Sequence, residues 1–149
     1  MAKQHRVSLV ACIVVLAMNA AAQASGWHRD VDAAMQLARA QQRPLVLFVT
    51  MDGCTYCHKM VETTLSDQGI LRVIGTQFVP AAIKATDRPD LMRKLKIRSF
   101  PTTLLVSPRG EIVDQITGYI DVRKFDDRLR RAHAYSIGTA SKPAPVVRK

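Results

Sequence analysis

Residues 45–57, LVLFVTMDGCTYC, decide the fold, because they join an apolar strand to a helix that begins with a cysteine. The run Leu45–Thr50 is apolar on both of its alternating faces, which is typical of a strand in the middle of a sheet covered by helices. Asp52 and Gly53 are turn residues. We therefore predict a strand, a tight turn and a helix over 54–65.

Cys54 and Cys57 are placed to exchange disulfides. Side chains three positions apart in a helix lie near each other, so the two sulfurs can reach one another. The first sulfur lies where unpaired N–H groups and the positive end of the helix dipole favour a thiolate. This position supplies up to about 2 kcal/mol, which raises the thiolate share at neutral pH from about 3% for a free cysteine to about half. The spacing therefore indicates a redox site.

Hydrophobic periodicity alternates between helical and strand spacing outward from this stretch. The predicted helices cover 30–42, 54–65, 67–74, 87–96 and a last segment capped by Asp121; the predicted strands cover 45–50, 78–83, 102–106 and 111–117. The last two strands are joined by turn residues, so they should form an antiparallel hairpin. This order predicts an α/β fold, with a mixed sheet and helices on both of its faces.

Both ends of the chain differ from the region between them. Residues 1–24 have the layout of a secretory signal peptide, with a small-residue cleavage site at Ala22-Gln23-Ala24. An uncleaved membrane anchor and a lipoprotein site at Cys12 are the alternatives. Residues 25–134 then form one domain, and 135–149 are predicted to be a disordered basic tail. We expect the protein in the periplasm or secreted or, with an uncleaved N-terminus, anchored to the membrane.

The chain is basic, with 22 Lys and Arg against 12 Asp and Glu and a net charge of +10. A basic surface attracts acidic partners or anionic headgroups. The basic residues are scattered, however, aromatic residues make up only 5% of the chain, and no nucleic-acid-binding motif accompanies them. We therefore expect no nucleic-acid partner and interpret the charge as favouring solubility and weak steering.

The segment Ser99-Phe100-Pro101-Thr102 lies directly ahead of the predicted hairpin. With this proline, the cysteine pair after the first central strand and the order of elements, the chain resembles the thioredoxin-like family over residues 27–134. It is most similar to the small exported members that begin with a Trp-containing segment and a helix. The resemblance implies a thioredoxin-like fold, a central mixed sheet flanked by helices on both faces.

The resemblance also implies roles for the site residues. Cys54 would be the attacking thiol and Cys57 the resolving one. The Phe100-Pro101 bond would be cis and face the site, so that the backbone near Phe100 binds an extended substrate peptide. We expect a monomer with no cofactor and no metal, protein thiols or disulfides as partners, and a membrane protein as electron donor.

Four neighbours of the cysteines affect this chemistry. His58, one turn from Cys54, would favour its thiolate further if protonated, or would only point to solvent. Asp52 would oppose the thiolate if it lies close. Gly53 replaces the aromatic residue that normally precedes the first cysteine, and Phe48 aligns with the buried acid that normally accepts the proton of the resolving thiol. The last two departures weaken the prediction of efficient thioredoxin-type reduction.

The predicted function is that of an exported thiol-disulfide oxidoreductase acting as a reductant. An oxidase is the next choice, and an isomerase is less favoured because family isomerases usually carry a dimerisation region. Two rival interpretations stay open. One is a thioredoxin-like binding module without catalysis, and the other is a c-type haem protein, since residues 54–58 form a CxxCH string with Met60 or Met92 as an axial ligand.

Overall fold

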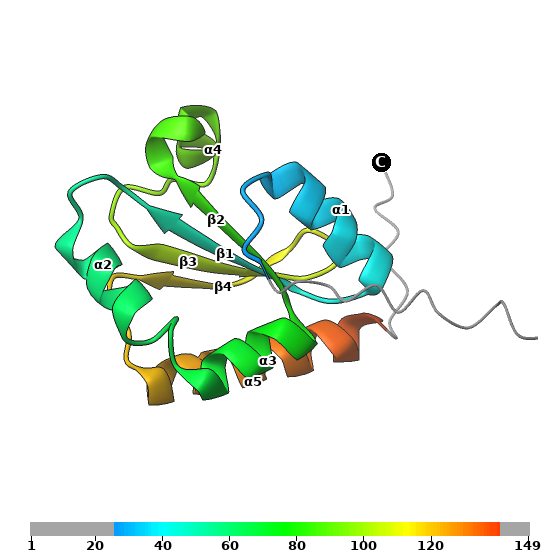
Figure 1. The fold of residues 1–149 in the computed structure, drawn as a ribbon. Helices are drawn as coiled ribbons and strands as arrows, with labels where there is room; N and C mark the ends of the chain where they lie inside the picture. The colour runs from blue at the N-terminus through cyan, green and yellow to red at the C-terminus, as the bar shows by residue number, and fades with distance from the viewer. Residues whose placement is uncertain (1–25, 141–149) are drawn as a thin grey trace, which may run out of the picture.

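The computed structural model describes residues 26–140 and contains a four-stranded sheet in the order β2-β1-β3-β4 (Figure 1). β1 (Leu45–Thr50) and β2 (Val79–Lys84) are parallel. β3 (Thr102–Val106) pairs antiparallel both with β1 and with β4 (Ile112–Thr117). The predicted mixed sheet and its antiparallel hairpin are confirmed.

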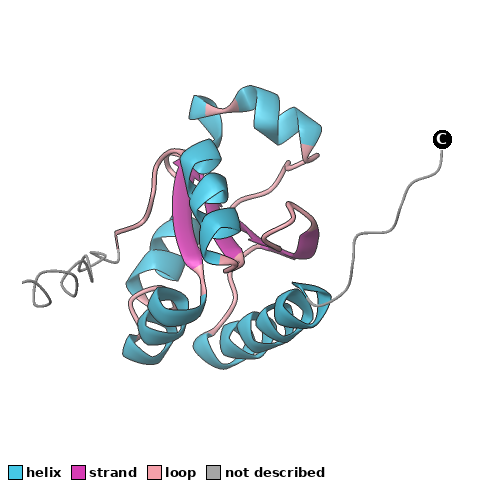
Figure 2. Ribbon diagram, turned by 90° about the vertical axis from the view of Figure 1, so that its right-hand side faces the viewer, coloured by secondary structure: helices cyan, strands magenta, loops and turns pink. Residues whose placement is uncertain are grey.

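Helices cover both faces of this sheet. α1 (Val31–Gln41) and α4 (Pro89–Lys94) lie on one face, and α2 (Thr55–Glu62), α3 (Gln68–Gln77) and α5 (Val122–Ala140) lie on the other. Figure 2, turned by 90°, again shows helices above and below the strands. The architecture is the predicted α/β arrangement with a helical layer on each side.

Acidic side chains begin three of the helices. The Asp30 carboxylate accepts hydrogen bonds from the backbone N–H groups of Asp32 and Ala33 at 2.9 and 3.0 Å, which confirms the predicted cap of α1. Asp67 and Asp121 cap α3 and α5 in the same way, each with a bond of 3.0 Å. These caps satisfy N–H groups that have no partner within a helix, so they fix where each helix starts.

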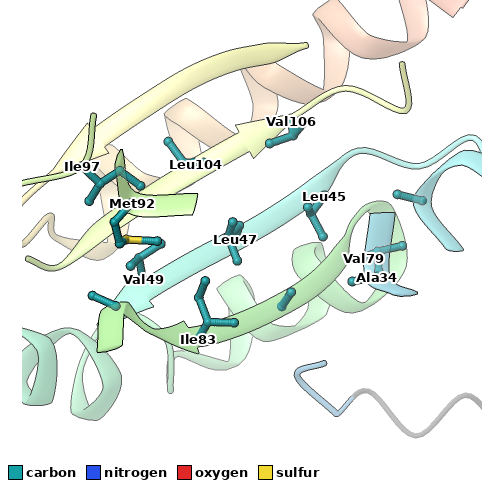
Figure 3. Close-up of a cluster of buried hydrophobic side chains, with 13 residues drawn as sticks. Ala34, Leu45, Leu47, Val49, Val79, Ile83, Met92, Ile97, Leu104 and Val106 are labelled. Atoms are coloured by element: carbon teal, nitrogen blue, oxygen red, sulfur yellow. The ribbon is translucent and has the colours of Figure 1, made fainter. Parts of the chain in front are cut away.

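The core consists of two layers of buried side chains, one on each face of the sheet. Leu45, Leu47 and Val49 of β1 face α1 and α4, as Figure 3 shows, whereas Val46 and Phe48 face α2, α3 and α5. All five side chains are at most 3% exposed. The prediction that this strand is buried on both faces is confirmed.

The predicted helix over 87–96 is interrupted. A 3-10 turn, η1 (Ala85–Asp87), precedes α4, which begins only at Pro89. The residue before a proline is disfavoured in the α region, and Arg88 has φ −136° and ψ 62°. The break therefore follows from Pro89 itself.

The last helix is longer than the sequence predicted. α5 continues to Ala140, so the prediction of a disordered tail from 135 onward is wrong for residues 135–140. Ser136 is only 2% exposed and its hydroxyl donates to the Ala132 carbonyl at 2.8 Å, so the buried face of the helix extends past 134. Residues 141–149 and the predicted signal peptide, 1–24, lie outside the described residues. Within 26–140, no helix combines the length and apolar character needed to cross a bilayer.

Candidate active site

The first cysteine of the pair lies at the end of the turn that connects β1 to α2. Cys54 is the N-cap of the helix, and its sulfur accepts the backbone N–H of Cys57 at 3.1 Å. The turn before it passes through Gly53, whose φ of 72° lies in the left-handed region that favours glycine. The predicted position of the sulfur at the start of the helix is confirmed, and a backbone N–H group is already directed at it.

Cys54 and Cys57 form a disulfide, with their Cα atoms 5.2 Å apart. The two sulfurs differ in access to solvent. Cys57 is 2% exposed and packs with Phe48 and Met60 in the layer beneath α2, whereas Cys54 is half-buried at the edge of that layer. A large substrate can therefore approach the Cys54 sulfur but not the Cys57 sulfur.

The Phe100-Pro101 peptide bond is cis, as the resemblance implied. Thr102 pairs with Val49 near the end of β1, so the residues just before β3 lie at the same edge of the sheet as the loop to Cys54. The Pro101 carbonyl accepts the N–H of Gly118 at 2.7 Å, so it is occupied within the protein. The half-buried Phe100 packs against both core layers. The residues just before Pro101 are thus placed at the sheet edge that also carries the loop to Cys54.

A charged pair lies beside the cysteine loop. The Lys84 ammonium is 2.7 Å from the Asp52 carboxylate. The hydrogen bond to Asp52 and its negative charge raise the pKa of Lys84. This ion pair offsets the charge by which Asp52 would oppose a Cys54 thiolate.

Sequence reasoning missed Lys84, because its place beside Asp52 depends on strand register. Lys84 pairs with Thr50 at the ends of the parallel strands β2 and β1. The usable signal was that parallel strands end at the same edge of a sheet. A charged residue ending β2 should therefore lie near the loop that follows β1.

The layer beneath the cysteines is apolar where the family places an acid. Phe48 is 3% exposed and its ring meets the ring of Trp27 edge to face, with centroids 6.5 Å apart. No carboxylate is buried anywhere in residues 26–140. Proton loss from Cys57 is therefore not assisted by a buried acid in the described part of the chain.

Residues 118–120, which follow β4, form a second loop that contacts α2 and the proline loop. The Thr64 hydroxyl of the α2–α3 connection donates to the Ile120 carbonyl at 2.7 Å, and the Lys59 ammonium lies 4.5 Å from the centre of the Tyr119 ring. Gly118, next to Tyr119, binds the Pro101 carbonyl. These contacts hold α2, the proline loop and residues 118–120 together, and no local sequence pattern indicated them.

His58 is exposed on the first turn of α2, where its backbone N–H donates to the Cys54 carbonyl at 3.2 Å. Its effect on the Cys54 thiol stays a prediction. Within the described residues, no group of three or more His, Cys, Asp or Glu side chains is arranged to hold a metal ion.

Comparisons with known proteins agree with this geometry. A family model for a thioredoxin-like domain matches residues 31–133. The chain is 31% identical over 106 residues to the thiol:disulfide interchange protein DsbD of Citrobacter koseri, and 27% identical over 103 residues to DsbD of Yersinia pestis. These alignments cover 67% and 66% of this chain but only 19% and 17% of the relatives, so the chain spans less than a fifth of their length.

Solved structures show the same fold. A thioredoxin from Thermus thermophilus matches with a TM-score of 0.69 and 23% identity, over 80% of this chain and 98% of that one. The oxidised C-terminal domain of DsbD from Neisseria meningitidis matches with a TM-score of 0.62 and 20% identity, over 72% of this chain and 99% of that domain. The predicted resemblance is confirmed: the chain belongs to the thioredoxin-like family, with the Cys54–Cys57 disulfide at the start of α2.

Proposed function

We propose that this protein is an exported thiol-disulfide oxidoreductase that reduces disulfides of other proteins. The observation that carries the proposal is the asymmetry of the pair: Cys54 is half-buried at a helix N-cap with a donor directed at its sulfur, and Cys57 is buried behind it. An accessible sulfur that is stabilised as a thiolate serves as the nucleophile, and a covered sulfur serves for resolution.

The reaction begins with the reduced pair. The Cys54 thiolate attacks one sulfur of a client disulfide, so that a Cys54–client disulfide forms and the other client sulfur leaves as a thiolate, which takes a proton from water. Cys57 loses its proton to solvent and attacks the Cys54 sulfur. The Cys54–Cys57 disulfide forms, the second client thiolate leaves, and two electrons have passed to the client. A dithiol donor reduces the pair again by the reverse sequence.

Substrate binding is assigned to Phe100 and Pro101. The backbone ahead of Pro101 lies at the edge of the sheet that carries Cys54, and an extended client segment would add to it as a strand does. Phe100 would contribute apolar contact to that segment. The register of β3 against β1 supports this assignment.

The direction of electron flow is argued from the surroundings of Cys54. A strongly oxidising pair needs additional positive charge or donors that stabilise its reduced thiolate. The donor recorded at the Cys54 sulfur is the N–H of Cys57, and the neighbouring Lys84 is engaged by Asp52. This balance supports a potential at the reducing end of the family's range.

Export and a membrane electron donor complete the proposal. The pattern of residues 1–24 supports passage to the periplasm, where a reductant needs electrons delivered across the membrane. The relatives named thiol:disulfide interchange protein DsbD support thiols or disulfides of proteins as partners. We expect the domain to act as a monomer.

The test is the reduction potential of the Cys54–Cys57 pair, measured in thiol buffers of stepped composition. A value near about −270 mV supports a reductant, and one near about −120 mV would show an oxidase instead. Turnover of a disulfide substrate by the protein and by Cys54→Ser is the companion measurement. Equal rates for the two proteins would leave only a binding module, which Phe48 in place of a buried acid favours as the second candidate.

A further inference from the structure

Three exposed cations gather at the end of α4. Arg93, Lys96 and Arg98, here called the basic cluster, line a pocket together with Met92 and Ile97. The apolar pair forms the floor, since Met92 is 8% and Ile97 is 6% exposed. The sequence alone suggested scattered positive charge, whereas the fold concentrates these three charges around one depression.

The charges of the basic cluster are not neutralised within the described residues. The ion pairs found among residues 26–140 involve cations outside the basic cluster, namely Lys84, Arg88, Lys124, Arg128 and Arg130. Asp90, the acidic residue of α4, lies 3.3 Å from Arg88 and is occupied by it. An unneutralised group of like charges attracts a partner of opposite charge. The cluster is thus complementary to an acidic surface.

The backbone fixes the basic cluster beside the candidate active site. The Ile97 N–H donates to the Met92 carbonyl at 2.9 Å and the Lys96 N–H donates to the Arg93 carbonyl at 3.2 Å, which closes the turn after α4. Met92 and Ile97 belong to the same core layer as Val49, the residue of β1 paired with Thr102 (Figure 3). Two residues after Arg98 the chain reaches Phe100 and the cis proline.

We propose that the basic cluster binds an acidic segment of the protein whose disulfide is exchanged at Cys54. This inference rests on the proposed function and deepens it by naming the chemistry of the partner. An extended segment paired with the backbone ahead of Pro101 advances about 3.3 Å per residue, and Arg98 lies only two residues before Phe100, so residues of the segment close to its cysteine reach the cluster. Acidic residues at those positions speed the encounter and hold the register.

A protein segment fits this surface better than a lipid bilayer does. The basic cluster is continuous with the loop at Phe100, so an extended acidic peptide engages the charges and the loop together. A bilayer would engage the charges alone, and the apolar floor of Met92 and Ile97 is too covered to insert. The proposed occupant is therefore an acidic stretch of a client or donor protein.

The test uses disulfide-linked peptides that differ only in the residues flanking cysteine. One set carries Glu on the amino-terminal or the carboxyl-terminal side of the cysteine, and the reference set carries Gln at the same places. The rate of exchange with the reduced full-length protein is measured at about 0.01 M salt, where the screening length is about 30 Å, and at about 1 M, where it is about 3 Å. We expect a Glu peptide to react about tenfold faster at low salt and the preference to vanish at high salt.

Two variants with the same loss of charge complete the design. R93Q/K96Q/R98Q removes the basic cluster, and R72Q/R130Q/R131Q removes three exposed cations from α3 and α5 on the opposite face of the sheet. The first variant should lose the preference for Glu and keep its rate with the Gln peptides. The second should retain the preference.

Each outcome is decisive. Equal rates with Glu and Gln peptides, or the same loss in both variants, would overturn the proposal. Binding of the protein to vesicles of anionic phospholipid that only R93Q/K96Q/R98Q loses, without any peptide preference, would overturn it in favour of a membrane surface. A failure of the proposed function has a different signature, because then no peptide of either set would exchange with Cys54.

Discussion

The difference between the two sulfurs predicts a large difference in their reactivity toward a small alkylating reagent. Cys57→Ala leaves Cys54 as the single described thiol, and Cys54→Ala leaves Cys57. The N-cap position and the directed N–H group stabilise a Cys54 thiolate by up to about 2 kcal/mol, which is about thirtyfold in the ratio of thiolate to thiol and about fifteenfold in the thiolate share at neutral pH. Cys57 is 2% exposed, so the folded chain must also open before it reacts. We therefore expect Cys54 to be alkylated about fifteenfold faster or more.

The assay is iodoacetamide modification at neutral pH, followed over time by mass spectrometry of the two variants. The same reaction in concentrated urea is the control, since the helix dipole and the burial are absent from an unfolded chain. There both thiols should react at similar rates. Similar rates in the folded proteins as well would refute the reasoning, because neither the helix terminus nor the packing would then distinguish the sulfurs.

Three further predictions concern stability and substrate binding. Arg43→Met should lower the free energy of unfolding by about 2–4 kcal/mol in urea titrations. The Arg43 guanidinium donates to the carbonyls of Ile74, Gly75 and Phe78, and in the variant these acceptors lose their charged donor. An unchanged unfolding midpoint would contradict this. Asp121→Ala should lower Tm at pH 7 but not well below pH 3.8. The Lys124 N–H lowers the pKa of Asp121 in the folded chain. The cap therefore stabilises the fold above the pKa that Asp121 has in the unfolded chain, and this stabilisation is lost as the pH falls through the pKa in the folded chain. A Tm difference that persists in acid would argue against this cap. Phe100→Ala should raise KM for protein disulfides about tenfold or less while leaving the rate with a small aromatic disulfide unchanged; equal losses on both substrates would remove Phe100 from substrate binding.

The sequence determined those elements whose cause is local. β1 was predicted with its observed bounds, because a short apolar run between a proline and a turn indicates a buried strand. Asp30 and Asp121 marked two helix starts, since capping needs only a side chain and the next few N–H groups. The break before Pro89 was equally local, and the proline rule applied to Arg88 would have found it.

Contacts between distant segments were beyond reach of the sequence. The pairing of Lys84 with Asp52 depends on the register of two parallel strands; their shared edge was a usable signal, but the register that places Lys84 opposite Thr50 is shown only by the structure. The prediction failed for a different reason at the end of α5. The composition after residue 134 suggested disorder, whereas the helical spacing of the buried residues was decisive. Ser136 lies four residues after Ala132 and eleven after Phe125 on one buried face, and a serine that bonds within its own helix can be buried there.

The site lies where the two core layers meet, and this position separates sulfur exchange from partner selection. The layer beneath α2 holds Cys57 in place, and the layer beneath α4 holds Met92 and Ile97. Phe100 packs against both layers, so the proline loop keeps its distance to Cys54 only if both are intact. The charged ends of the basic cluster project from this frame without supporting it, since none of them is buried. Charge in the cluster can therefore change partner selection while the geometry of sulfur exchange stays the same.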